Sequence, residues 1–224
     1  MSNVKEILAV IASFSTLLQF LSGSLTCLQY IRRKSVGEDS HLPFIAGFLN
    51  CSIWFSYGMV AQESTILTVN VIGLVLFFAY TFIHYLYSIQ RHVVIRDFLI
   101  CLLLVGLMNI YSLMGIQKQT LQYHIGNLAS LVTVLFFAAP LANLAHVIRS
   151  RNASSLPLPF IFMTSVSTSL WFLYGIVVAD VYVQLPNAAG FILSVFQLSL
   201  IVLYKSRDVI PMVRMKENLK EYEL

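Results

Sequence analysis

The sequence predicts an all-α membrane protein with seven transmembrane helices, arranged as two parallel three-helix bundles joined by a linker helix. Three observations support this prediction: an apolar composition, seven uncharged windows and an internal repeat. Of the 224 residues, 58% are hydrophobic and 11% are charged, whereas a soluble domain carries about 25% charged residues. The mean hydropathy is +0.80, so there is too little polar surface to coat a water-soluble globule.

The charged residues delimit seven apolar windows. All 14 Lys and Arg residues and all 10 Asp and Glu residues lie outside these windows. Each window has about the 20 residues that cross ~30 Å of hydrocarbon. The windows cover approximately residues 7–31, 42–61, 65–89, 98–116, 125–148, 156–179 and 181–204. The first is interpreted as a helix and not as a cleavable signal peptide, because it is long and lacks a small-residue cleavage site.

The distribution of basic residues predicts the orientation. Twelve Lys and Arg residues lie on the side of the odd-numbered connections and the C-terminus, and only Lys5 and Lys118 lie on the other side. The positive-inside rule then places the N-terminus in the extracellular or luminal space and the C-terminus in the cytoplasm. The same residues are scattered over short loops, which argues against nucleic-acid binding.

An internal repeat organises the chain. The segment 49–60, LNCSIWFSYGMV, returns 117 residues later as VSTSLWFLYGIV at 166–177, with six identical positions. The same offset places Asn70 on Asn187. It pairs the first three windows with the last three and leaves the fourth without a partner. A repeat of three helices crosses the membrane an odd number of times, so two directly joined repeats would have opposite orientations. The fourth helix adds one crossing and makes the two repeats parallel, an arrangement that occurs in transporters.

The repeat also predicts the domain boundaries. We expect a first three-helix repeat at 1–89 and a linker helix with its loops at 90–123. A second three-helix repeat follows at 124–204, and a cytoplasmic tail at 205–224.

The motifs of the two repeats resemble the SWEET (MtN3/saliva) family of sugar transporters, in its animal-type form, over residues 7–207. The marks of this resemblance are Leu42-Pro43-Phe44, Leu49-Asn50-Cys51, Trp54 with Tyr57-Gly58, Val69-Asn70 with Gly73, Pro140-Leu141, Leu158-Pro159-Phe160, Trp171 with Tyr174-Gly175, Asp180, and Pro186-Asn187 with Gly190. The resemblance implies a uniporter that moves mono- or disaccharides in both directions by alternating access, with no cofactor or metal. Its partners would be a small sugar and the lipid bilayer, in the plasma membrane, the Golgi or both. A homo-oligomer is left open.

The resemblance also implies a binding site. Asn70 and Asn187 would contact the sugar, and Trp171 would lie against its ring. The repeat partner of Trp171 is Trp54, where many plant members carry a smaller residue, so we expect a narrower pocket that prefers monosaccharides. Asparagine offers donors and an acceptor to sugar hydroxyls, and tryptophan offers a flat face and an N–H donor. The alternative is that the asparagines only bond helices together, but their match at one offset favours a site.

Two tyrosine–glycine pairs are candidates for an extracellular gate. Tyr57-Gly58 and Tyr174-Gly175 each begin three residues after a tryptophan, about one helical turn nearer the predicted outer side. We expect a tyrosine hydroxyl to bond to Asp180 and close the outer mouth. The alternative is that Asp180 is a solvated loop residue.

A set of prolines is the candidate hinge. Pro43 and Pro140 match family positions, and either Pro157 or Pro159 fills a third, with the repeat register favouring Pro159. At the fourth position Gly23 replaces the proline of plant members, and glycine can also bend a helix. We expect Gly23→Pro to be tolerated, because it would restore the pattern of those members. Pro43 and Pro157 could be benign helix-start prolines. Pro140 lies deep within its window and is predicted to kink the helix.

The windows contain no acidic residue, which predicts transport uncoupled from protons. His84, His124 and His146 lie near window ends and are interpreted as interfacial. No catalytic or metal-binding constellation is present, so we do not expect an enzyme. Two alternatives remain: a PQ-loop-type carrier that exports amino acids, and a membrane adaptor on the same scaffold that does not transport.

Overall fold

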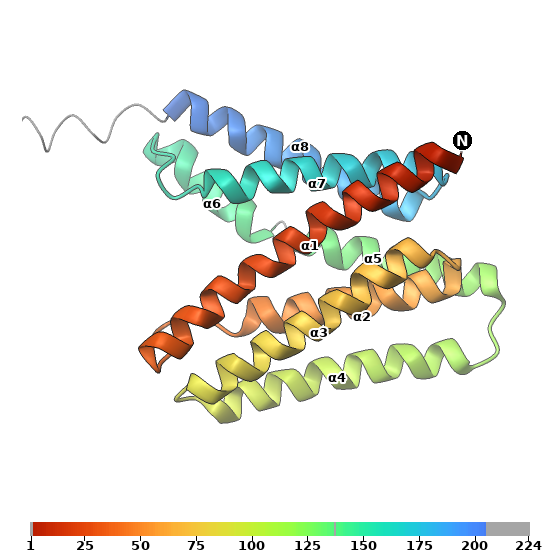
Figure 1. The fold of residues 1–224 in the computed structure, drawn as a ribbon, viewed down its shortest axis with the longest axis horizontal. Coiled ribbons are helices and arrows are strands. Elements are labelled where there is room, and N and C mark those ends of the chain that lie inside the picture. The colour runs from red at the N-terminus through yellow and green to blue at the C-terminus, as the bar shows by residue number, and fades with distance from the viewer. Residues whose placement is uncertain (1, 137, 205–224) are drawn as a thin grey trace, which may run out of the picture.

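The computed structural model describes residues 2–136 and 138–204, and these form helices joined by short connections (Figure 1). The helices are α1 (Ser2–Arg33), α2 (Leu42–Ala61), α3 (Ser64–Tyr87), α4 (Arg91–Leu113), α5 (Lys118–Leu135), α6 (Ala138–Ser150), α7 (Leu158–Val177) and α8 (Val181–Tyr204). The described ranges contain no strand. An all-helical chain suits a bilayer because each helix satisfies its own backbone polar groups, and the predicted fold class is confirmed.

The internal repeat is visible in the packing of the helices. In the first half α1 packs on α3 and α3 packs on α2, while in the second half α5 packs on α8 and α8 packs on α7. The halves meet through two equivalent contacts, α1 with α7 and α5 with α2. The linker α4 has no repeat partner and packs against α2 and α3, on the side away from α7 and α8 (Figure 1).

The turns repeat as well as the helices. Gln62 and Ala179 have φ values of 60° and 54°, and Lys34 and Arg151 have φ values of 57° and 51°. The members of each pair are 117 residues apart. Left-handed residues of this kind commonly end a helix, so equivalent helices end in equivalent ways in the two halves.

Among the described residues, the buried core joins the two halves at one end. One apolar cluster contains Tyr57 of the first half and Tyr174 of the second, and we call this the tyrosine end. At the opposite end, where α1 ends at Arg33, each half has a cluster of its own, around Tyr80 in one and Val147 in the other. We call this the arginine end. Toward it the ribbons of α2 and α3 diverge from those of α7 and α8 (Figure 1).

The fifth predicted span is divided in the structure. Six described helices are long and apolar enough to cross a membrane, namely α1, α2, α3, α4, α7 and α8. The window 125–148 instead forms α5, which ends at Leu135, and α6, which begins at Ala138. Pro140 therefore lies in the first turn of α6, and the prediction that it lies deep within one helix is wrong. A proline cannot donate to the carbonyl four residues earlier, and that carbonyl belongs to Phe136, where α5 stops.

The other predicted hinge prolines lie at helix starts. Pro43 and Pro159 are the second residues of α2 and α7, and Pro157 is the N-cap residue of α7. At a helix start the missing proline N–H leaves no intrahelical bond unmade. The hinge role of these three residues stays a prediction.

Gly23 lies where a larger residue does not fit. A Cβ atom added at this position would lie 2.6 Å from a ring carbon of Tyr80. That ring is 4% exposed, and its hydroxyl donates to the carbonyl of Phe20 at 3.1 Å, so it has little freedom to move aside. The expectation that Gly23→Pro is tolerated is therefore wrong for this conformation: glycine is needed for the close approach of α1 and α3.

For the sugar transport that the resemblance implies, we expect Pro140→Ala to lower the maximal rate severalfold while changing the half-saturating sugar concentration little. Alanine restores an N–H that can bond to the Phe136 carbonyl, so α5 and α6 would join into one stiffer helix. Flux in proteoliposomes over a range of sugar concentrations measures both quantities. Pro157→Ala is the comparison, because a helix-start proline is not expected to matter to the same degree. An unchanged rate in Pro140→Ala would show that this break is not a hinge.

Candidate functional site

A cavity of about 170 Å³ lies between the two halves. Its walls come from α1, α2 and α3 of the first half and from α5, α7 and α8 of the second. The lining residues are Thr16, Gln19, Phe20, Asn50, Trp54, Ile66, Val69, Asn70, Thr133, Ser167, Thr168, Trp171, Val183 and Asn187. All four predicted substrate-binding residues line this cavity, and none of the described lining residues carries a charge.

The two asparagines are held in the same way. The Nδ2 group of Asn70 donates to the carbonyl of Ile66 at 2.8 Å, and that of Asn187 donates to the carbonyl of Val183 at 2.8 Å. These bonds to the preceding helical turn orient both amides. Among the described residues neither Oδ1 atom accepts a hydrogen bond, so each asparagine keeps one acceptor and one N–H for a ligand.

Each tryptophan is fixed by a threonine of the other half. Trp54 Nε1 donates to Thr133 Oγ1 at 2.9 Å, and Trp171 Nε1 donates to Thr16 Oγ1 at 2.7 Å. Thr16 and Thr133 are themselves 117 residues apart, so the two contacts are equivalent. The indole N–H groups are thus engaged with protein, and what each tryptophan presents to the cavity is its ring.

The threonines extend these contacts into two matched triads. The hydroxyl of Thr133 lies 3.1 Å from Asn50 Oδ1, and that of Thr16 lies 3.2 Å from Ser167 Oγ. Asn50 and Ser167 are equivalent positions on α2 and α7. Each triad therefore ties a helix of one half to a helix of the other across the cavity, which makes ring position dependent on how the halves are packed.

A tyrosine covers each tryptophan toward the tyrosine end. The ring centroids of Trp54 and Tyr57 are 5.6 Å apart and those of Trp171 and Tyr174 are 5.4 Å apart, both edge-to-face. This geometry is favourable for aromatic pairs. Both tyrosine side chains are completely buried, so they close the cavity at this end.

The tyrosine hydroxyls reach carboxylates of the opposite half. Tyr57 donates to Asp180 Oδ2 at 2.6 Å, which is the kind of bond expected from the sequence. Tyr174 donates to Glu63 Oε2 at 2.9 Å. Glu63 and Asp180 are 117 residues apart, so the two bonds form a reciprocal pair across the interface. Hydrogen bonds to charged acceptors are about twice as strong as neutral ones.

The two carboxylates differ in their other partners. Asp180 Oδ1 accepts the backbone N–H groups of Tyr182 and Val183 at 2.9 and 3.2 Å, and so caps the start of α8. Glu63 instead accepts Lys5 of α1, whose Nζ lies 3.1 Å from each carboxylate oxygen. The Lys5 and Glu63 pair ties α1 to the start of α3.

The glycines of the predicted gate allow the close turns that present these carboxylates. A Cβ added to Gly58 would lie 3.1 Å from Leu67 of α3, and one added to Gly175 would lie 2.9 Å from Gln184 of α8. The Gly175 carbonyl also accepts the Asp180 N–H at 2.8 Å. These glycines therefore permit close helix packing within their own half, and their part in a gate stays a prediction.

A profile of sugar efflux transporters for intercellular exchange matches residues 6–92 and 123–208, one copy for each half of the chain. The chain belongs to the SWEET family. It is 43% identical to the sugar transporter SWEET1 of Drosophila pseudoobscura pseudoobscura over 205 residues, which are 91% of either chain. It is 28% identical to the bidirectional sugar transporter SWEET15 of Oryza sativa subsp. indica over 88% of this chain and 63% of that one. A solved eukaryotic SWEET transporter superimposes with a TM-score of 0.83 at 28% identity, covering 91% of this chain and all of the other.

Membership of this family agrees with the prediction that the chain is not an enzyme. Several residues of the cavity and of the predicted gate in this SWEET protein were not identified from the sequence, among them Thr16, Thr133, Asn50 and Glu63. A systematic comparison at the 117-residue offset would have pointed to three of these four, because Thr16 matches Thr133 and Glu63 matches Asp180, whereas Asn50 falls on Ser167.

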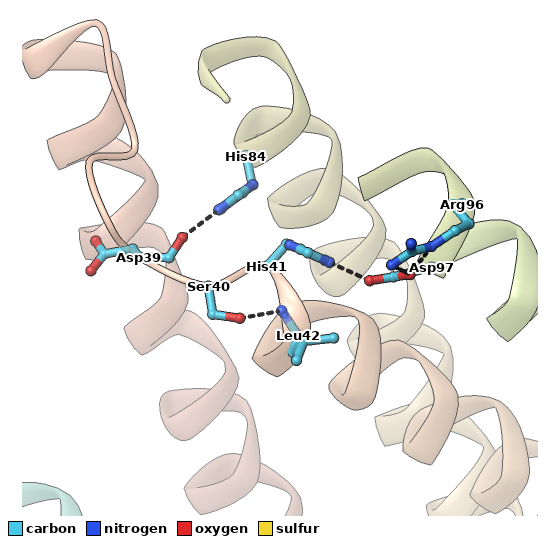
Figure 2. A network of polar contacts seen from close by, with 7 residues as sticks. All are labelled: Asp39, Ser40, His41, Leu42, His84, Arg96 and Asp97. Carbon is cyan, nitrogen blue, oxygen red and sulfur yellow. Dashed lines mark hydrogen bonds and ion pairs between the residues drawn. The ribbon is translucent and has the colours of Figure 1, made fainter. Parts of the chain in front are cut away.

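At the arginine end, a histidine pair ties the α1–α2 connection to α3 and α4 (Figure 2). His84 was expected to be interfacial, but it is 2% exposed, and its Nε2 lies 3.0 Å from the Asp39 carbonyl. His41 Nε2 lies 2.8 Å from Asp97 Oδ2, and Arg96 donates to the other oxygen of Asp97 at 2.8 Å (Figure 2). The expectation for His84 is corrected because this connection folds over it. None of these residues lines the cavity.

Proposed function

We propose that this chain is a facilitative, bidirectional sugar uniporter that moves mono- or disaccharides across a membrane by alternating access. The observation that carries the proposal is the uncharged cavity between two equivalent halves, with one asparagine from each half facing it. Membership of the SWEET family supports the same function.

The chemistry of the cavity favours a sugar over an amino acid. A sugar needs partners for hydroxyls that both donate and accept, and apolar surface for its C–H groups. Asn70 and Asn187 supply the first, and the rings of Trp54 and Trp171 supply the second. An amino acid carries an ammonium and a carboxylate, which are costly to bury without charged partners, and no lining residue is charged.

The unequal packing of the two ends supports alternating access. The halves share one core at the tyrosine end and have separate cores at the arginine end. This is the arrangement of a transporter that is closed at one side while its halves are parted at the other. By the positive-inside rule the arginine end faces the cytoplasm, so we assign this conformation as inward-facing, with the extracellular or luminal gate closed.

The finer assignments belong to the same proposal. They are the repeats at 1–89 and 124–204, the linker at 90–123, the tail at 205–224, and residence in the plasma membrane, the Golgi or both. The tail lies outside the described residues. The position of the large Trp54 ring in the wall of the cavity supports a preference for monosaccharides. A homo-oligomer remains open.

Tracer flux into proteoliposomes tests the function. We expect flux of a monosaccharide in either direction, with little flux of a disaccharide or of amino acids. Amino-acid flux without sugar flux would favour the PQ-loop-type carrier, and absence of any flux would favour the adaptor. Protease accessibility of a tag at each terminus tests the orientation.

We expect transport to be uncoupled from protons and sodium ions. The physical reason is that no acidic or histidine side chain lines the cavity in the part of the chain that the structure describes, and coupled carriers place such residues on the transport path. The measurement is sugar accumulation in proteoliposomes under an imposed pH or sodium gradient. The sugar should equilibrate and go no further. Accumulation above the external concentration would contradict this prediction.

A further inference from the structure

A second cavity lies between α3 and α4, away from the transport site. Its volume is about 230 Å³, and its lining residues are Phe78, Thr81, Phe82, Tyr85, Val94, Ile95 and Phe98. Phe78, Phe82 and Ile95 are about half exposed, so the cavity is a groove on the surface that faces lipid. The Thr81 hydroxyl is bonded within its own helix to the Phe77 carbonyl, which leaves an almost entirely apolar lining. Because α4 has no repeat partner, the second half has no equivalent groove.

A fixed positive charge, that of Arg91, lies at the arginine end of this groove. The guanidinium carbon of Arg91 lies 5.7 Å from the ring centroid of Tyr85, a lining residue. One of its nitrogens donates to the carbonyl of Leu86 at 2.8 Å. In the described ranges no carboxylate lies within ion-pair distance of Arg91. The guanidinium is thus held in place by neutral partners, and its charge is not compensated.

The start of α4 adds to this unbalanced charge. Arg91 and His92 occupy the first turn, which contains no acidic residue, and Gln90 provides no side-chain cap. The unpaired N–H groups of a helix start carry a partial positive charge and favour anions. The Arg91 guanidinium places a full positive charge beside this partial charge, so the two together favour an anion.

We propose that the α3–α4 groove binds an anionic phospholipid, with the phosphate at Arg91 and the start of α4 and one acyl chain along the phenylalanine rings. Tyr85 and Phe78 are about two turns apart, or ~10 Å along the helix axis, which matches a headgroup at the end and the upper part of a chain in the groove. A zwitterionic lipid is the weaker ligand, because its ammonium offsets the phosphate charge. The cytoplasmic leaflet is rich in anionic lipids. The placement of the groove in the cytoplasmic leaflet rests on the proposed orientation of the chain. The proposed binding of an anionic phospholipid does not depend on that orientation.

The test compares palmitoyl-oleoyl phosphatidylglycerol with phosphatidylcholine of the same chains, added to the full-length protein in detergent. Lipid binding is counted by native mass spectrometry, and thermal stability is measured in parallel. We expect phosphatidylglycerol to bind at one saturable site and to raise the melting temperature more than phosphatidylcholine. Arg91→Gln should weaken phosphatidylglycerol binding about five- to tenfold, and Ile95→Trp, which fills the groove, should weaken both lipids. Arg33→Gln, a matched loss of charge at the end of α1, should retain the preference.

Three outcomes would overturn the proposal. One is equal binding of the two lipids to the parent protein. Another is an equal loss in Arg33→Gln and Arg91→Gln, which would mean that only total charge matters. The third is full stabilisation by glycerol phosphate alone, which would mean that the groove plays no part and the site takes a soluble anion. The melting temperature of each variant in phosphatidylcholine reports whether it is folded.

Discussion

Replacing Asn70 or Asn187 by alanine is expected to reduce sugar flux at least tenfold in this SWEET protein, with normal folding and membrane insertion. Each asparagine uses one N–H on its own helix and keeps its Oδ1 and second N–H for a ligand. Alanine removes both groups from the wall of the cavity. Leaving buried hydroxyls of the sugar without partners costs about 1–3 kcal/mol for each bond lost.

Asn127→Ala is a matched control for this experiment. The Asn127 side chain makes the same kind of bond, to the carbonyl of Tyr123 four residues earlier at 2.7 Å, but it does not line the central cavity. Flux in proteoliposomes and thermal stability in detergent are measured for the three variants. Near-parental flux in both Asn70→Ala and Asn187→Ala would contradict the site. An equal loss in Asn127→Ala would mean that asparagines stabilise the helices and do not bind the sugar.

The sequence was sufficient to predict the helices that follow from composition alone. Charge-free windows mark where the chain crosses lipid, because an unpaired charge there is costly. They could not locate the division between α5 and α6, since hydropathy is the same for a kinked helix and for two short ones. The position of Pro140 in the sequence did indicate where this division lies. A proline breaks the bond to the residue four places earlier, and that residue, Phe136, is where α5 stops.

The residues of the central cavity were predictable where the residue type itself indicates how it binds a ligand. They were less predictable where the role of a residue depends on the side chain that it contacts. Asn70 and Asn187 were found because they match each other at the 117-residue offset and resemble the sugar-contacting asparagines of the family. Thr16 and Thr133 are ordinary helix residues, and they matter because each receives an indole N–H from the other half. These hydrogen bonds depend on which helices pack against each other, and a single sequence does not show this packing.

Glu63, at the predicted gate, is another residue whose role depends on contacts that the sequence does not give. It lies outside the windows, as a solvated loop residue would, and its sequence neighbours do not suggest a role. The structure places it under the Tyr174 hydroxyl and beside Lys5, contacts made by α7 and α1. Only the equivalence of Glu63 with Asp180 in the repeat could have suggested this position.

The Tyr57→Phe and Tyr174→Phe pair is expected to open the tyrosine end and to slow transport strongly. Each substitution keeps the buried ring and removes one O–H donor to a carboxylate of the opposite half. Tyrosine variants are preferable to Asp180→Ala, because Asp180 also caps α8 and its loss would destabilise that helix. Hydrogen bonds to charged groups contribute about 1.5–3 kcal/mol, so each lost bond shifts the closed-to-open ratio by roughly tenfold or more.

The opening can be measured directly with spin labels at Met59 and Ile176, which are equivalent in the repeat and are 57% and 49% exposed. Both lie within two residues of a gate tyrosine on the last turns of α2 and α7, so their separation reports the outer opening. We expect a population of molecules with a longer distance between the labels. This population should be small in each single variant and dominant in the double variant, and sugar flux should be lower in the double variant than in either single variant. Tyr111→Phe is the control, because its hydroxyl bonds to His124 and not to a carboxylate. An unchanged distance distribution and normal flux in the double variant would mean that the shared apolar core holds this end closed without the reciprocal bonds.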